Sequence, residues 1–68
     1  MQRVHYSIDG LINTHTKTHL KNALNKIEGV KMVNVDLERS TVEVGFDENT
    51  NDTQIKNTVI DTGFSILN

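Results

Sequence analysis

Three short segments of this chain alternate apolar and polar residues, and this alternation constrains the fold more than any other feature. The segments are residues 4–8, 33–37 and 42–46. A period of two sends successive side chains to opposite faces of a strand, so each segment is expected to be a half-buried strand. The polar turn at 38–40 joins the second and third segments as an antiparallel hairpin with one apolar face.

Two segments have helical spacing, one between the first two strands and one after the third. The first, between residues 13 and 28, predicts a helix with one stripe facing the core, formed by Thr16, Leu20, Ala23, Leu24 and Ile27. Asn13 or Thr14 can cap the start of this helix, and Gly29 is expected to end it.

A second helix is expected over residues 51–62. Asn51 and Gln54 have the spacing of a capping-box variant. The expected apolar face consists of Ile55, Val59 and Ile60. Gly63 ends the helix, and residues 64–67 can form a short final strand.

The order of elements predicts an α+β fold, a single ferredoxin-like βαββαβ sandwich over residues 1–68. Right-handed crossovers give a four-stranded antiparallel sheet with both helices on one face. The other face is expected to be polar and solvated, with His5, Ser7, Asn34, Asp36, Thr41 and Glu43.

Composition narrows the possible functions. Seven basic and nine acidic residues give a net charge of −2, and the chain has three aromatic residues, which argues against a nucleic-acid partner. No apolar run has the length of a membrane span or a signal peptide, so we expect a cytoplasmic protein without membrane association. The absence of cysteine excludes disulfides and thiolate metal sites.

Several stretches together resemble the heavy-metal-associated domain family, in particular copper chaperones of the CopZ type. They are residues 8–11, 23–30, 33–37, 41–44, 55–56 and 61–64, and the resemblance covers nearly the whole chain. In that family the loop after the first strand reads Gly-Met-x-Cys-x-x-Cys, and its thiolates bind Cu(I) for transfer to a partner of the same fold. The resemblance implies a role in copper handling.

All three sulfur-bearing positions of the family motif are replaced in this chain. The methionine corresponds to Leu11, and the two cysteines correspond to Asn13 and Thr16. Amide and hydroxyl oxygens are poor ligands for Cu(I), which selects thiolate, thioether and imidazole. We therefore expect structural roles for Asn13 as a helix cap and for Thr16 on the apolar stripe.

His15 and His19 are the candidate metal ligands. Their spacing of four puts both imidazoles on one side of the first helix, beside the family's metal loop. The alternative is a solvated helix face that also carries Lys17 and Lys21, since two imidazoles without a third ligand bind weakly. His5 is expected to be solvated, Met32 to pack, and Phe64 either to lie beneath the loop or to cover the edge of the core.

No catalytic constellation appears, and we expect no enzymatic activity. One hypothesis is a copper-chaperone-like protein that either binds Cu(I) through His15 and His19 or keeps only the docking surface. The alternative is a metal-free module that docks on a soluble domain of a copper-transporting ATPase, on another protein of this fold or on itself, as a monomer or weak dimer. Lys17 and Lys21 would then meet an acidic partner. A regulatory ferredoxin-like domain that pairs through its sheet edge is a third possibility.

Overall fold

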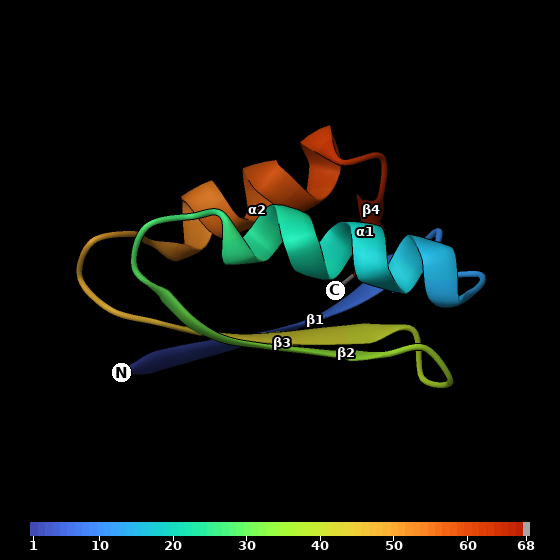
Figure 1. Ribbon diagram of the computed structural model, residues 1–68, viewed down its shortest axis with the longest axis horizontal. Helices are drawn as coiled ribbons and strands as arrows, with labels where there is room; N and C mark the ends of the chain where they lie inside the picture. The colour runs from blue at the N-terminus through green and yellow to red at the C-terminus, as the bar shows by residue number, and fades with distance from the viewer. Residues whose placement is uncertain (68) are drawn as a thin grey trace.

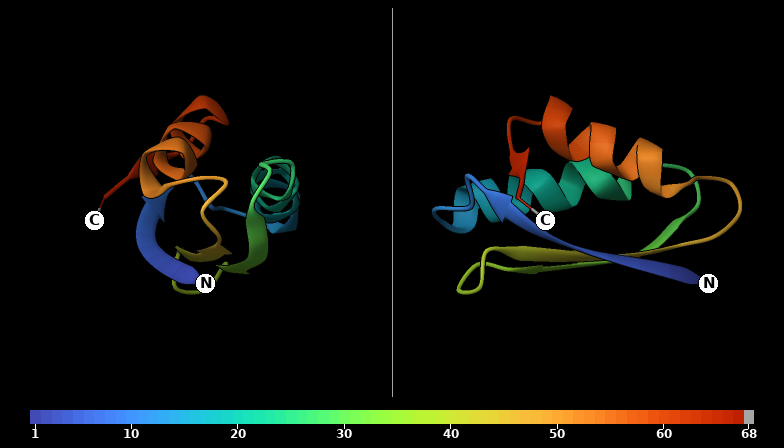
Figure 2. Two further views of the ribbon diagram at one scale, coloured as in Figure 1. Left: turned by 90° about the vertical axis from the view of Figure 1, so that its left-hand side faces the viewer. Right: turned by 180° about the vertical axis from the view of Figure 1, so that it is seen from behind.

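The computed structural model describes residues 1–67, so residue 68, the last of the predicted domain, lies outside the described residues. The elements follow one another as β1 (Gln2–Asp9), α1 (Thr14–Asn25), β2 (Val30–Asp36), β3 (Thr41–Phe46), α2 (Asp52–Asp61) and β4 (Ser65–Ile66). The strands form one antiparallel sheet in the order β2-β3-β1-β4. Both helices cover the same face of this sheet (Figure 1, Figure 2). The predicted ferredoxin-like fold is confirmed.

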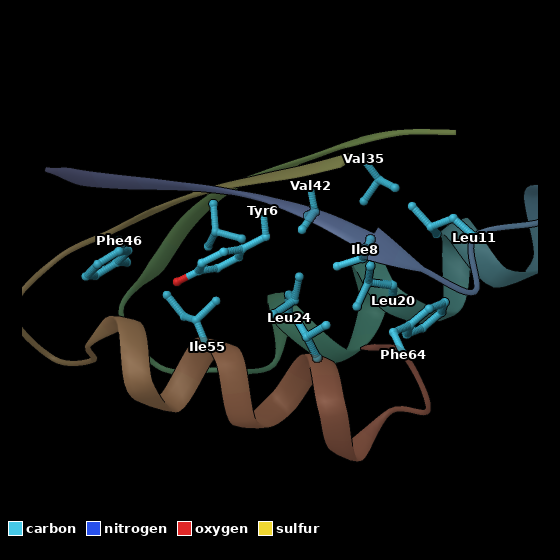
Figure 3. Close-up of a cluster of buried hydrophobic side chains, with 12 residues drawn as sticks. Tyr6, Ile8, Leu11, Leu20, Leu24, Val35, Val42, Phe46, Ile55 and Phe64 are labelled. Carbon is cyan, nitrogen blue, oxygen red and sulfur yellow. The ribbon is translucent and has the colours of Figure 1, made fainter. Parts of the chain in front are cut away.

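The core lies between the sheet and the two helices. Alternate residues of the strands point toward the helices, and Val42, Val44 and Phe46 of the central strand β3 are all buried. The helices contribute four buried residues to the same cluster, Leu20 and Leu24 from α1 and Ile55 and Val59 from α2. Alternate residues of the strands and residues four apart on the helices therefore pack into one apolar cluster (Figure 3).

Helix α1 ends earlier than its apolar stripe predicts. The α-helix stops at Asn25, and the amides of Lys26 and Ile27 donate to carbonyls three residues back, at 3.4 and 3.1 Å. This tightening satisfies the last carbonyls and leads into Gly29, which has a φ of +98°. Ile27 still packs against the core from this final turn.

Two further details differ from the predictions. Ile60 was expected on the apolar face of α2 but is 54% exposed, because Ile55 and Val59 already fill that face and the next residue turns away from it. Strand β2 begins at Val30 rather than at residue 33, since Val30 pairs with Phe46 ahead of a register shift.

Candidate functional site

The loop between β1 and α1, residues 10–13, has a buried anchor and an exposed tip. Gly10 has a φ of +109°, and a Cβ placed on it would lie 3.0 Å from Cδ1 of Phe64. The Phe64 ring therefore lies directly against the loop while it also closes the end of the core, next to buried Leu11 (Figure 3). Ile12 is 78% exposed. Phe64 thus does both things considered from the sequence, since it packs against the loop and covers the edge of the core.

Asn13 and Thr16, which replace the family's cysteines, form a reciprocal capping box at the start of α1. Oδ1 of Asn13 accepts the backbone N–H of Thr16 at 2.9 Å. Oγ1 of Thr16 accepts the backbone N–H groups of Asn13 and Ile12, both at 3.1 Å, and donates to the carbonyl of Asn13 at 2.8 Å. Asn13 is thus the N-cap, and Thr14 is the first residue of the helix.

These bonds use the whole hydrogen-bonding capacity of the Thr16 hydroxyl. A hydroxyl has one proton to donate and two lone pairs, and Thr16 Oγ1 donates once and accepts twice. A metal ion would have to break one of these bonds to gain a hard oxygen ligand. The amides of Ile12 and Asn13, just before the helix, are also already satisfied. These hydrogen bonds and the packing of Phe64 and Leu11 order the loop.

His15 and His19 are both exposed on the first two turns of α1. Their spacing lets both imidazoles reach one ion from the same side of the helix. Within residues 1–67, no three histidine, aspartate or glutamate side chains gather closely enough to hold one metal ion. The pair would therefore need a ligand from solvent or from a partner.

Helix α1 presents a basic surface next to the loop. Its sequence contains Lys17 and Lys21 and neither aspartate nor glutamate. The N-terminal end of a helix carries a partial positive charge, and no acidic residue in the first turn of α1 offsets it. The exposed apolar tip at Ile12 is therefore followed directly by a helix that carries Lys17 and Lys21.

The polar face of the sheet, opposite the helices, holds a shallow depression of about 200 Å³. Its floor is built by cross-strand neighbours, since His5 and Asn34 both lie opposite Glu43 in the register of the sheet. The lining residues are His5, Asn34, Asp36, Arg39, Thr41 and Glu43. Asp36 and Arg39 pair within this lining, at 3.8 Å. The lining thus combines two carboxylates and one guanidinium with neutral polar groups, as expected for a solvated sheet face.

The βαββαβ order, with an exposed loop ahead of the first helix, defines a small domain of the heavy-metal-associated class. The model of the heavy-metal-associated domain family matches residues 6–65, and the chain belongs to this family. Among residues 1–67 no helix is long and apolar enough to span a membrane.

Known relatives include copper-handling proteins. The chain is 31% identical to a copper chaperone CopZ of Staphylococcus haemolyticus (strain JCSC1435) over 61 residues, which cover 88% of this chain and 90% of the relative. A solved CopZ metallochaperone superposes with a TM-score of 0.92 at 28% identity, covering 97% of this chain and 100% of the other. A copper-binding domain from HMA7, a P-type ATPase, gives 0.90 at 27% identity, with coverage of 100% and 96%.

Sequence reasoning found the cap but missed the role of Thr16. We placed Thr16 on the apolar stripe, whereas it is half-buried and its hydroxyl turns back to the loop. The third helical position usually carries Glu or Gln in a capping box, so threonine there gives a weak signal. The spacing of three between Asn13 and Thr16 was the available clue.

Proposed function

We propose that this chain is a non-enzymatic docking module of cytoplasmic copper handling whose loop holds no ion. It associates with a partner of the heavy-metal-associated fold, such as the soluble domain of a copper-transporting ATPase. The observation that carries the proposal is the saturated hydroxyl of Thr16, which keeps the loop ordered without metal. The family membership and the copper-binding relatives support copper handling as the setting.

The docking face is the loop together with α1. Ile12 offers an exposed apolar contact at the tip, and the flanking lysines offer positive charge to an acidic partner surface. A domain that docks in this way covers the partner's metal loop without presenting thiolates. It therefore competes with a copper-loaded chaperone for the same partner instead of delivering copper.

An NMR titration tests this function. The ¹⁵N-labelled chain is mixed with the copper-binding domain of a P-type ATPase, and amide shifts are expected in residues 10–21. Ile12→Ser should weaken the association by about tenfold or more, as expected for loss of a central apolar contact. Ile60→Ser is the matched control, because Ile60 is also exposed but lies on α2. Shifts confined to other surfaces, or no shifts, would reject the proposed function.

A second candidate function is copper binding by His15 and His19, favoured by their common exposure and spacing on α1. Cu(I) would then be held by two imidazoles and a third ligand from solvent or from the partner. Anaerobic Cu(I) titration with a competing chelator, followed by imidazole NMR signals, distinguishes the two functions. Shifts of both imidazoles near one equivalent support this candidate, and unchanged imidazoles remove it.

A further inference from the structure

The two methionines of the chain meet at Gly45 on the polar face of the sheet. The sequence has no cysteine and two methionines, Met1 and Met32, which are 31 positions apart. Gly45 of β3 lies between them. A Cβ placed on Gly45 would be 3.0 Å from Sδ of Met1, 3.3 Å from its Cε and 3.4 Å from Cβ of Met32. The two methionine side chains therefore share the space that a side chain at position 45 would fill.

The sheet register explains this meeting. Gly45 pairs with Met32 on one side and with Arg3 on the other, and it faces away from the helices as Glu43 does. Met1 extends from the start of β1 and leans back over the glycine. Gly45 is buried although it lies on the outer face, which we attribute to the two methionines that cover it. Packing of this kind was predicted for Met32 alone.

The place is separate from the family's metal loop. Met1 directly precedes β1, whereas the loop follows the other end of that strand. The N-terminus and the loop accordingly lie at opposite ends of the sheet (Figure 1, Figure 2). Loop ligands and this methionine pair cannot bind the same ion.

From this arrangement we propose a soft-metal site in which the thioethers of Met1 and Met32 bind one Cu(I) or Ag(I) ion over Gly45. Thioether sulfur selects soft ions such as Cu(I) over hard ones. Met1 is 69% exposed, so its sulfur is accessible, and the flexible side chain of Met32 can turn its sulfur toward the same point. Exposed Arg3 lies opposite Gly45 on the next strand and repels a cation there, a divalent ion about twice as strongly as a singly charged one.

The test uses the full chain with its methionine methyl groups labelled with ¹³C. Intact mass first verifies that Met1 is present. Ag(I), which does not change oxidation state, is added in chloride-free buffer, and Cu(I) is added anaerobically as its acetonitrile complex. Both methyl signals should shift together along one binding curve that saturates near one equivalent.

Two variants probe the site without touching the docking face. Met32→Leu keeps the shape but removes one sulfur, and it should weaken binding at Met1 by about tenfold or more. Gly45→Val keeps both sulfurs but fills the space between them, and the same loss is expected. A ¹⁵N spectrum checks that each variant is folded.

Three results would overturn the site. The first is a response of only one of the two methyl signals. The second is that the Met32→Leu variant binds the metal ion as tightly as the parent chain. The response could also disappear in a His15→Asn/His19→Asn double variant, which would assign the ion to the helix instead. The docking titration is independent of these readouts, so failure of this site and failure of the proposed function are distinguishable.

Discussion

Asn13 and Thr16 bind each other in both directions across the first turn of α1, with the amide of Thr16 donating to Asn13 Oδ1 and the amide of Asn13 donating to Thr16 Oγ1. In the family motif these two positions carry the metal-binding cysteines. The same spacing that lets two sulfurs hold one ion here lets two oxygens hold the chain's own amides. In this chain the two side chains hold the start of the helix by hydrogen bonds.

Removal of the Thr16 hydroxyl should destabilise the fold. Thr16→Ala leaves the amides of Ile12 and Asn13 without their acceptor, and loss of a capping interaction costs about 1 kcal/mol. Urea denaturation followed by circular dichroism measures the change. Thr18→Ala is the control, because Thr18 is exposed in the same helix, and its free energy of unfolding should change by less than about 0.5 kcal/mol. Equal effects of both substitutions would contradict the role of the cap.

The Tyr6 hydroxyl is a buried polar group without a hydrogen-bond partner in the part of the chain that the structure describes. Tyr6 is only 7% exposed, and its ring points between Phe46 and Ile55 (Figure 3). Leaving such a group unsatisfied costs about 1–3 kcal/mol. Tyr6→Phe should therefore keep or raise the free energy of unfolding, as measured by urea denaturation at pH 7. A loss of more than about 1 kcal/mol would show that the hydroxyl has a partner.

Stability should fall at alkaline pH because of the same residue. Burial, and then the negative charge of Asp52, raise the pKa of Tyr6 above its ordinary value of 10.0. The unfolded chain then loses the phenol proton at a lower pH than the folded chain does. The free energy of unfolding is therefore unaffected by this group below pH 10 and falls as the pH rises above it. Denaturation curves between pH 8 and about 11 for the parent chain and Tyr6→Phe isolate this effect. Parallel pH profiles would contradict it.

The two glycines that follow the helices should respond differently to alanine. Gly29 and Gly63 have φ values of +98° and +110°, so both substitutions strain the backbone by roughly 1–3 kcal/mol. A Cβ on Gly29 would also lie 2.8 Å from Oδ1 of Asp47 and 3.1 Å from the amide nitrogen of Thr50. A Cβ on Gly63 would meet no atom of residues 1–67 within 4 Å, apart from its own chain neighbours. Thermal unfolding should show the larger loss for Gly29→Ala. A larger loss for Gly63→Ala would contradict this account of the turn.

Much of the fold followed from the sequence because its signals are local. Strand alternation and the glycines that follow the two helices are signals that depend on neighbours only, and they predict the order of elements correctly, although α1 already ends at Asn25. The exposure of Ile60 was missed, since three apolar residues compete for a face that two of them fill.

The site was harder to predict than the fold. The residue type of Asn13 predicts a helix cap. The orientation of the Thr16 hydroxyl toward the loop depends on the side-chain rotamer, which residue type does not predict. The meeting of Met1 and Met32 over Gly45 depends on the strand register, which no local pattern contains.

Anaerobic Cu(I) titration, followed through the amide signals of residues 11–16, tests the central claim most directly. A chelator competes for copper, and an Asn13→Cys/Thr16→Cys variant serves as the positive control, because it restores two soft ligands at the family's spacing. We predict that one equivalent of Cu(I) shifts these amides in the variant and leaves them in place in the parent chain. Stoichiometric shifts of the Asn13 and Thr16 amides in the parent chain would show that its loop binds copper and would contradict the account.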